Sequence, residues 1–477
     1  MIQRGIVAGT AMAIGQTNLS DEDPETAGTA TPTANSQEGG FREVALLAYP
    51  LVLTQMSITA MGVVDSIIVG RLGAAPLGAV GLGGMWVWTV TSFFVGTSIG
   101  VQTFVAQSHG AGRTRDCGPW SWQGLASIVP LAALAAIAIG LGANLIVDWL
   151  APSEALAPLA SGYMRARSIG IVGITAAVSM SSFFRGIGDT RTPLYATVAV
   201  NIVNLVLDLG LVFGHFGLPK LGVVGAGLAT SISEWLYFVI LAYLFLRPSL
   251  AEEFNTGFRA PVWDEIKRLW RIGIPIGGQW ILEMLSFALF TTLVARMGDA
   301  ALAASHAFIQ LLSLSFMQAT GISTAASTLV GRYIGAGKLQ RVDRSFRSSI
   351  VLGSLLGALI AGLFLLVPDL LIGVFSKDPA VLAYGRPLLA IGALYQFLDA
   401  IGIVTDGALR GAGDTRWPFV VRCTLSWAVF LPAAYLMAFP LGGGLTGAWL
   451  GGLVHITLLA VFLIRRFHSG AWRTITI

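Results

Sequence analysis

The chain has 477 residues, of which 55% are hydrophobic and only 11% are charged, and its mean hydropathy is +0.75. This composition leaves too little polar surface to cover a soluble globule of that length, so it excludes a soluble fold and indicates an integral membrane protein. The net charge of +4 is ordinary for such a chain. Two isolated cysteines, Cys117 and Cys423, give no basis for a disulfide framework.

The first 43 residues differ from the rest of the chain. Residues 1–15 carry one arginine and a weak apolar run, and residues 16–40 are acidic and rich in Ser, Thr and Pro. We therefore predict a disordered cytoplasmic tail over residues 1–43. A cleaved signal peptide is the alternative, but it would place the mature N-terminus outside, against the charge distribution of the loops.

Twelve apolar stretches follow, each long enough to cross about 30 Å of hydrocarbon as a helix of about 20 residues. We predict membrane spans at residues 44–70, 77–107, 122–150, 163–184, 193–214, 221–246, 270–295, 302–330, 346–375, 381–409, 418–439 and 445–464. The predicted fold class is thus an all-α membrane protein with two six-helix lobes at 44–246 and 270–464. A cytoplasmic linker at 247–269 joins them, and a cytoplasmic tail at 465–477 ends the chain.

The Lys and Arg residues predict the orientation, because loops rich in them stay cytoplasmic. The two terminal segments and the loops after even-numbered spans hold 21 of the 29, and the loops after odd-numbered spans hold 7. Arg422, the remaining one, lies one turn inside the eleventh span, from which it can reach the cytoplasmic surface. Both termini are therefore expected in the cytoplasm of a cell whose plasma (inner) membrane holds the protein.

A seven-residue motif occurs twice, 225 residues apart. It runs Arg-Gly-Ile-Gly-Asp-Thr-Arg at 185–191 and Arg-Gly-Ala-Gly-Asp-Thr-Arg at 410–416. The same offset relates Pro50 to Pro275 and the Gly-Ala-Gly sequences at 110–112 and 335–337. Two structurally equivalent halves follow, and because each has six spans they enter the membrane in the same sense. We predict that these motifs form tight cytoplasmic turns, with Asp189 and Asp414 capping or pairing locally.

Six acids inside the spans are not duplicated by the repeat. They are Asp65, Asp208, Glu234, Glu283, Asp399 and Asp406. An acid near the bilayer centre costs about 2.5 to 3.5 kcal/mol, so it is normally paired, solvated in a cavity or functional. For Glu234 and Asp406, a hydrogen bond to a neighbouring helix accounts for the residue as well as a function does.

The acids of the first half form a candidate ion site. Asp65 lies near the outer end of the first span, and Asn204 and Asp208 lie one turn apart on one face of the fifth. Thr230 and Glu234 share a face of the sixth span, with Glu234 one turn deeper, and all these side chains form one cluster if the first, fifth and sixth spans are neighbours. Two carboxylates in a medium of low dielectric constant need a shared proton or a bound cation, and oxygen ligands suit a small hard cation such as Na⁺.

The second half has its own pair, Glu283 and Asp399, in the seventh and tenth spans. An aromatic wall beside carboxylates would suit organic cations, so the aromatic residues of the second span are candidate cavity residues, although packing is the commoner role. These are Trp86, Trp88, Phe93 and Phe94.

No pattern typical of an enzyme or a nucleic-acid binding protein is present. The chain lacks a phosphate-binding glycine loop followed by Lys-Ser or Lys-Thr, which speaks against ATP-driven transport by this chain alone. The five histidines are scattered without metal-ligand spacing. We expect no cofactor, no catalytic residue and no nucleic-acid partner.

Taken together, the motifs resemble those of the multidrug and toxic compound extrusion (MATE) family of cation-coupled efflux transporters. The resemblance rests on the twin Arg-Gly-x-Gly-Asp-Thr-Arg loops, the twin Gly-Ala-Gly sequences, Val64-Asp65-Ser66 and the glycine-rich sequence at 221–230, and it covers residues 42–466.

The resemblance implies a V-shaped pair of lobes that exchange organic substrate outward for Na⁺ or H⁺ inward. In some members the ion site consists of residues that match Asp65, Asn204, Asp208 and Thr230; in others it consists of a Glu and an Asp that match Glu283 and Asp399. This chain carries both sets, so the coupling ion and the coupling lobe stay open. Small organic molecules and membrane lipids are the expected partners, and we expect a monomer.

Two alternatives remain. A flippase for lipid-linked oligosaccharides, from the same superfamily, would need a cationic cavity suited to pyrophosphate, whereas these spans contain acids and few Lys or Arg. A membrane scaffold or receptor without transport activity would leave the acids with structural roles alone.

Overall fold

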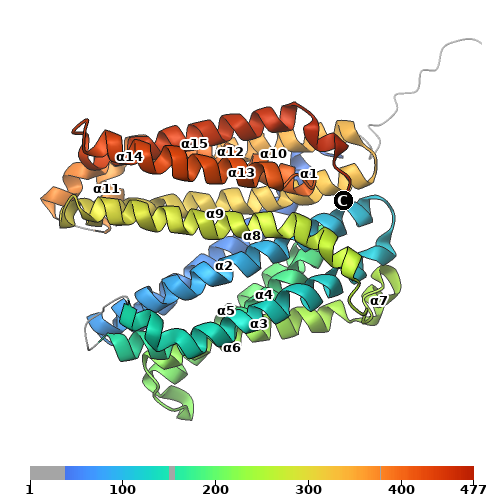
Figure 1. The fold of residues 1–477 in the computed structure, drawn as a ribbon, viewed down its shortest axis with the longest axis horizontal. Coiled ribbons are helices and arrows are strands. Elements are labelled where there is room, and N and C mark those ends of the chain that lie inside the picture. Colours follow the sequence, from blue (N-terminus) through green and yellow to red (C-terminus); the bar gives the residue numbers. More distant parts are fainter. Residues whose placement is uncertain (1–37, 150–155, 376–377) are drawn as a thin grey trace, which may run out of the picture. The chain divides into compact units, whose positions relative to one another are not determined.

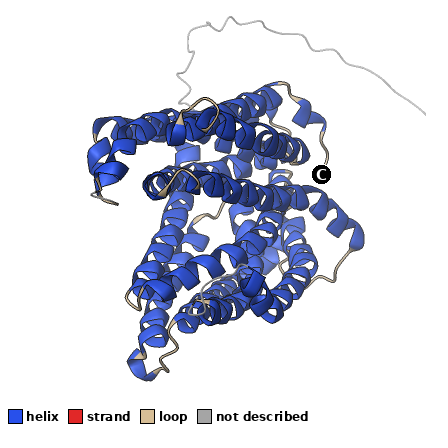
Figure 2. Cartoon of the chain, turned by 60° about the vertical axis from the view of Figure 1, so that its left-hand side comes forward, coloured by secondary structure: helices blue, strands red, loops and turns tan. Residues whose placement is uncertain are grey.

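The computed structural model describes residues 38–149, 156–375 and 378–477, and residues 37–477 form one compact unit. Most of the predicted N-terminal tail lies outside the described residues. Where the structure describes the chain, helices joined by turns account for it (Figure 2).

Twelve of the described helices are long and apolar enough to cross a membrane, one for each predicted span, which confirms the predicted number. The first half contains α1 (Phe41–Gly70), α2 (Ala74–Gly110), α3 (Cys117–Trp149), α4 (Ala157–Ile187), α5 (Arg191–Phe213) and α6 (Val223–Phe245) (Figure 1). The second half contains α8 (Trp263–Ala295), α9 (Asp299–Gly335), α10 (Leu339–Leu366), α12 (Pro379–Gly411), α13 (Arg416–Leu425), α14 (Leu431–Ala438) and α15 (Gly444–His468). A π-helical turn at Ser426–Phe430 joins α13 to α14 into one span.

Shorter elements connect these spans. They are α7 (Pro248–Phe254), α11 (Pro368–Gly373) and three 3₁₀ turns at Thr114–Asp116, His215–Gly217 and Ala471–Thr474. The predicted span at 346–375 differs most from the structure, because α10 starts at Leu339 and ends at Leu366. Pro368 then begins α11, as suits a residue that cannot continue a helix but fits the first turn of one.

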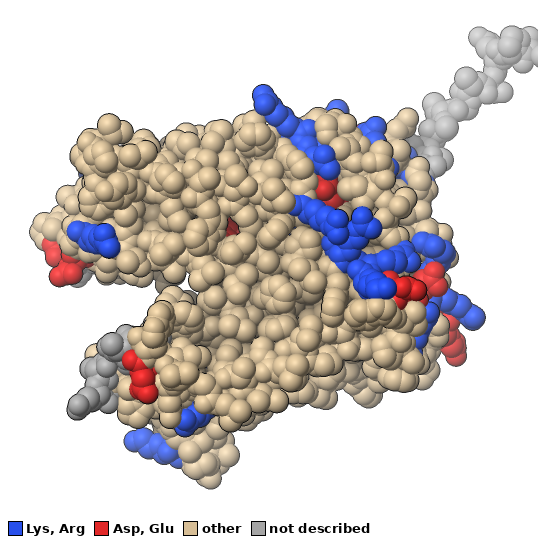
Figure 3. Space-filling model, in the orientation of Figure 1, with Lys and Arg blue, Asp and Glu red and all other residues tan. Residues whose placement is uncertain are grey.

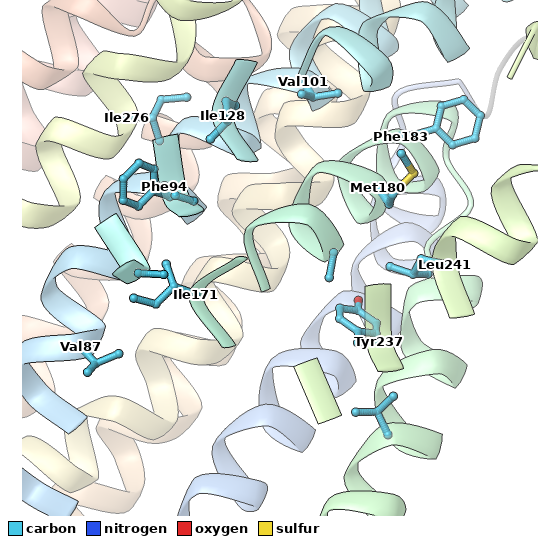
Figure 4. Close-up of a cluster of buried hydrophobic side chains, with 14 of the residues drawn as sticks. Val87, Phe94, Val101, Ile128, Ile171, Met180, Phe183, Tyr237, Leu241 and Ile276 are labelled. Carbon is cyan, nitrogen blue, oxygen red and sulfur yellow. The ribbon is translucent and has the colours of Figure 1, made fainter. Parts of the chain in front are cut away.

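Each half packs around one central helix. In the first half α4 contacts α2, α3 and α6, and in the second half α12 contacts α9, α10 and α15. The core of the first half gathers Phe94, Met180, Phe183 and Leu241 from α2, α4 and α6 (Figure 4). Ile276 of α8 lies in the same cluster, so a helix of the second half contributes to the core of the first.

Helices α1 and α8 each pack against helices of the opposite half. A Cβ on Gly96 of α2 would lie 2.8 Å from Cα of Gly277, and one on Gly100 would lie 3.0 Å from Cα of Gly273 on α8. Only glycine permits this approach of two helix backbones, since real Cβ contacts are longer. In the same manner α1 packs against α9.

The two Gly-Ala-Gly sequences mark the crossing of α2 and α9. A Cβ on Gly110 would lie 1.9 Å from the carbonyl oxygen of Arg332, and one on Gly335 would lie 2.0 Å from that of Gln107. The repeat offset relates Gly110 to Gly335 and Gln107 to Arg332, so the two contacts are equivalent. The two halves therefore meet here with twofold symmetry. The repeated glycines are therefore explained by close contact between the halves.

The two seven-residue motifs form the predicted turns. Gly188 and Gly413 have φ values of +91° and +84°, which favour glycine. Asp189 accepts hydrogen bonds of 3.2 and 3.0 Å from the first backbone N–H groups of α5 and so caps that helix. Asp414 instead pairs with Arg466 at 2.7 Å. The prediction of local capping or pairing is confirmed for Asp189, whereas Asp414 pairs with a residue of α15 that lies 52 positions further along the chain, so for Asp414 it is wrong.

These turns also join the two halves. The Thr103 hydroxyl of α2 donates to the carbonyl of Arg410 at 3.0 Å, and the Thr328 hydroxyl of α9 donates to the carbonyl of Arg185 at 3.0 Å. The repeat offset relates both the two threonines and the two arginines. We call this symmetric pair of hydrogen bonds the threonine latch.

The charged residues are unevenly distributed. Lys and Arg gather at the end that carries the C-terminus and the threonine latch, where the turns after α2, α4, α9 and α12 lie (Figure 3). At the opposite end, Figure 3 shows a hollow between the two halves. The halves therefore contact each other closely at the basic end and separate at the other.

Candidate functional site

Three helices of the first half bring the predicted ion-site residues together. Helix α5 packs against both α1 and α6, so the outer part of α1 lies beside the face of α5 that carries Asn204 and Asp208. The side chains of Asn204 and Asp208 are almost completely buried, each 1% exposed, while Asp65 is half-buried. Burial of two acids side by side is unusual and calls for a chemical partner.

Asn204 bridges the two carboxylates. With its NH₂ group directed toward them, the amide donates to Oδ1 of Asp65 at 3.0 Å and to Oδ2 of Asp208 at 3.2 Å, and we adopt this orientation because the reverse one would face oxygen with oxygen. The second oxygen of Asp208, Oδ1, is buried and has no hydrogen-bond partner in the described chain. An acceptor atom is thus left unsatisfied inside the cluster.

Thr230 lies on α6 and is half-buried. Its hydroxyl donates to the carbonyl of Ala226 at 3.1 Å, which leaves its oxygen lone pairs available as acceptors. In the described structure no hydrogen bond joins Thr230 to the two acids.

Glu234, one turn further along α6, has a different environment. It forms a two-pronged ion pair with Arg167 of α4, with distances of 2.7 and 3.0 Å, and both side chains are 12% exposed. Gly170 makes room for this pair, since a Cβ there would lie 2.1 Å from Oε2 of Glu234. Glu234 therefore has a fixed cationic partner and does not offer a free carboxylate.

Arg167 is one of the seven Lys and Arg residues that the charge count assigned to loops after odd-numbered spans, and this assignment is wrong. The structure places it inside α4, one turn after Tyr163. The predicted span from residue 163 already contained this arginine. The rule that buried acids need partners could have connected it with Glu234.

The second half also contains an ion pair. Arg422 Nη1 lies 3.2 Å from Oε1 of Glu283, and the Arg422 side chain is only 6% exposed. The expectation that Arg422 extends to the cytoplasmic surface is therefore wrong, because the charge of Glu283 draws it inward. Asp399 is 9% exposed and has neither a hydrogen bond nor an ion pair in the described structure, although Arg422 and Glu283 are close enough to act on it electrostatically.

The six acids thus divide into two groups. Glu234, Glu283 and Asp406 each pair with an arginine inside the helix bundle. Within the described residues, Asp65, Asp208 and Asp399 have no cationic side chain in salt-bridge contact. These three acids are therefore the ones available to bind a cation or a proton from outside the protein.

The predicted aromatic set of α2 has packing contacts. Phe94 is buried in the core of the first half, and Trp86 and Phe93 pack against that core. The ring of Trp86 meets the edge of Trp149 at 6.4 Å, and Trp88 is 43% exposed. These contacts are those of ordinary packing residues and do not place an aromatic wall beside the acids.

The described residues contain no group of three or more His, Cys, Asp or Glu that could hold a metal ion. A Na⁺ site would need no such group. The predicted ligands are Asp65, Asn204, Asp208 and Thr230, but the amide orientation adopted above directs the NH₂ group of Asn204, and not its oxygen, toward the two carboxylates. Hard oxygen ligands of this kind suit Na⁺ or a proton and do not suit zinc or copper.

Comparison with known proteins agrees with this picture. The MatE family model matches residues 50–210 and 275–440. The chain is 30% identical over 440 residues to a "Probable multidrug resistance protein NorM" of Thermotoga maritima, covering 90% of this chain and 93% of that protein. It is 28% identical over 432 residues to "Multidrug resistance protein MdtK" of Yersinia pseudotuberculosis, covering 89% and 94%.

Solved structures share the fold. The eukaryotic MATE transporter AtDTX14 superposes with a TM-score of 0.79 at 22% identity, covering 91% of this chain and 96% of that one. A multidrug resistance MATE family transporter of the MOP superfamily in an outward-facing conformation gives a TM-score of 0.81 at 20% identity, covering 93% and 99%. The predicted fold class is thus confirmed, and together with the family match over both halves these relatives show that the chain is a multi-pass membrane protein of the MatE family of multidrug efflux transporters.

Proposed function

We propose that this protein is a secondary antiporter that exports organic compounds, chiefly cationic and amphipathic ones, in exchange for H⁺ or Na⁺. The observation that carries the proposal is the pair of Asp65, which is half-buried, and Asp208, which is 1% exposed. Asn204 bridges the two carboxylates, and within the described residues no cationic side chain is in salt-bridge contact with them. Two adjacent carboxylates in this setting bind a proton or a small cation strongly, and they release it when the surroundings change.

The coupling ion follows from a direct test. The protein is reconstituted in liposomes, substrate is added, and proton flux and Na⁺ flux are recorded separately. Flux of one ion that depends on substrate would identify antiport and name the ion. Absence of both fluxes would favour the scaffold or receptor alternative, in which the acids are structural.

The flippase alternative fits the buried charges poorly. A pyrophosphate headgroup needs cationic side chains that are free to bind it. Arg167 and Arg422 are instead held by Glu234 and Glu283, and Arg410 is held by Asp406. Among the acids inside the helix bundle, Asp65, Asp208 and Asp399 have no arginine partner within the described residues, which favours a cationic substrate.

Asp399 and Glu283 are proposed to shape substrate recognition rather than ion coupling. Asp399→Asn should weaken the binding of a cationic substrate by about tenfold or more, because a desolvated charge pair contributes at least that much, and leave a neutral analogue of similar shape nearly unaffected. Glu283→Gln should act in the same direction but less, since Arg422 already balances Glu283. Equal loss for both compounds, together with loss of ion binding, would instead make the second half the coupling site.

The threonine latch is proposed as the cytoplasmic gate. Both termini and the basic loops are assigned to the cytoplasm by the excess of Lys and Arg, so the tight contact between halves closes that side. Alternating access then requires the latch to break and the crossing of α2 and α9 to separate. A pocket of about 280 Å³ beside the first seven-residue motif, lined in part by Thr328 and Arg332, adjoins this contact.

Removal of both latch hydroxyls should favour opening of this gate. In a Thr103→Val, Thr328→Val variant, the carbonyls of Arg410 and Arg185 lose their hydroxyl donors but keep their backbone donors. Loss of the two hydrogen bonds costs about 1 to 3 kcal/mol in total, so the ratio of open to closed states should rise by about fivefold to a hundredfold. The measurement is the distance between spin labels at Ala111 and Ala336, with the two native cysteines replaced.

The matched control is Thr405→Val, because the Thr405 hydroxyl is also buried but donates within its own helix, to the carbonyl of Ile401 at 2.7 Å. This control should leave the distance distribution as in the wild type. An unchanged distribution in the double variant would show that the latch does not hold the gate closed.

A further inference from the structure

A groove at the basic end of the molecule has no part in the transport site. It encloses about 460 Å³ beside the first residues of α1 and the first turns of α10. Its lining consists of Phe41, Gln340, Asp343, Arg344, Arg347, Ser348 and Val351. The groove is open to the outside, so a ligand could enter it without any movement of the two halves.

Two arginines in the groove are free to bind an anion. Arg344 and Arg347 lie one turn apart on α10, both are exposed, and neither has a hydrogen bond or ion pair with another residue of the described chain. The one acid of the lining, Asp343, is already bound by Arg473 at 3.1 Å. The groove therefore presents two uncommitted guanidinium groups, which recognise phosphate through paired N–H donors.

An apolar stripe runs from these arginines along α10. Val351, Leu355, Leu359 and Leu363 follow Arg347 at intervals of four residues, and they are 49, 57, 64 and 49% exposed. Each of these residues lies beside the next one in the row, and the row winds around α10 by about 40° per step. Since α10 has the highest mean hydropathy of the twelve spans, 2.4, we infer that the hydrocarbon of the bilayer covers this exposed row.

The groove therefore places the two arginines, which can bind an anion, directly beside the apolar stripe. The change from one to the other occurs within a single helical turn, between Arg347 and Val351. Exposed arginines on most surfaces are simply solvated. Here the cavity, the absence of ion-pair partners for the two arginines among the described residues, and the continuous stripe occur together at the end assigned to the cytoplasm. Basic pockets in that position are typical sites for anionic lipid headgroups.

We propose that this groove is a binding site for an anionic phospholipid, whose phosphate is held by Arg344 and Arg347 and whose acyl chain lies along the stripe from Val351 to Leu363. Phe41, 44% exposed at the start of α1, covers the side of the headgroup pocket. The site does not depend on antiport, because it shares no residue with the ion or substrate sites.

The test measures lipid binding to the purified full-length protein. Phosphatidylglycerol is titrated against phosphatidylethanolamine in nanodiscs or detergent, and bound lipid is counted by native mass spectrometry. In an Arg344→Gln, Arg347→Gln variant, phosphatidylglycerol binding should fall by about 25-fold, since each basic side chain near an anionic lipid contributes about a factor of five. The Arg344→Lys, Arg347→Lys variant should show a smaller loss than the glutamine variant, because lysine keeps the charges but not the paired N–H donors of the guanidinium group.

The matched control is Arg115→Gln, Arg416→Gln. Both residues are exposed and belong to turns at the same end of the molecule, but they do not line the groove. This variant removes the same net charge, so a loss equal to that of the groove variant would mean general attraction and would overturn the proposal. Unchanged phosphatidylglycerol binding in the groove variant would overturn it as well.

Soluble anions distinguish a lipid from a free phosphate ligand. Inorganic phosphate or glycerol phosphate at millimolar concentration should not displace the phosphatidylglycerol, because neither reaches the stripe. Displacement by either would show a simple anion pocket in place of a lipid site. Unfolding temperatures of all variants, measured in detergent, should match the wild type within a few degrees, since the replaced side chains are exposed.

Discussion

Asp208→Asn is expected to abolish ion-coupled efflux while expression and folding stay close to normal, and Asp65→Asn is expected to do the same. Each substitution keeps the shape of the side chain but removes one of the two charges that bind the proton or cation. The coupling between ion and substrate should then fall by about tenfold or more, the usual range for a lost coupling free energy. Efflux of a fluorescent substrate from proteoliposomes under an imposed ion gradient measures this.

Asp148→Asn is the matched control for this pair. Asp148 is an exposed acid near the outer end of α3, in the same half and toward the same end of the helices as Asp65. It should transport as the wild type does. If both site variants kept more than half of the wild-type efflux, coupling by Asp65 and Asp208 would be ruled out.

Separate loss of Arg167 or Glu234 should destabilise the protein strongly, whereas loss of both should not. Arg167→Gln leaves the Glu234 carboxylate buried without its partner, and Glu234→Gln leaves a buried guanidinium. Removal of one member of a buried pair costs about 3 to 5 kcal/mol. Thermal unfolding in detergent should therefore show a marked fall in unfolding temperature for each single variant and substantial recovery for the double variant.

The corresponding change at an exposed pair is the comparison. Arg386 and Asp369 lie 2.6 Å apart at the surface, with side chains 74 and 61% exposed. The pairing lowers the pKa of Asp369, but water screens the interaction, so Arg386→Gln should alter stability little. Additive losses in the Arg167→Gln, Glu234→Gln double variant would contradict the view that the two residues act as one neutral unit.

Much of this fold could be predicted from the sequence, because the bilayer imposes a simple rule on each span. Length and hydropathy give the twelve helices, and the repeated motifs give two equivalent halves. The proximity of Asn204 and Asp208 follows from their spacing on one helix face. The position of Asp65 beside them depends on the packing of α1 against α5, and hydropathy does not predict which helices pack together.

The partners of the buried acids could not be predicted with the same ease. Glu234 meets Arg167, and Glu283 meets Arg422, only because particular helices lie side by side. A count of Lys and Arg by loop treats each arginine as a surface charge and so obscures these pairs. Where a predicted span contains an arginine, an acid at equal depth in another span is its expected partner.

The repeat also conceals differences between the halves. The π-helical turn at Ser426–Phe430 occupies the repeat position of residues 201–205, which include the ion-site residue Asn204. Ser426 there lies 3.4 Å from Nε2 of His455, the repeat counterpart of Thr230. The second half therefore has another backbone and other polar groups where the first half holds its candidate ion site. Sequence offset alone cannot show such a change in backbone.

The central claim is that binding of a cation at Asp65 and Asp208 drives release of the substrate. The most direct measurement is the rate at which substrate dissociates from purified protein, first across pH without Na⁺ and then across Na⁺ at fixed pH. Since ion and substrate act on each other only through their different affinities for the two conformations, release should quicken as pH falls or as Na⁺ rises, and Asp208→Asn should remove the response. A response to one variable alone would name the coupling ion, whereas a release rate that depends on neither, or a response that persists in Asp208→Asn, would contradict antiport by this site.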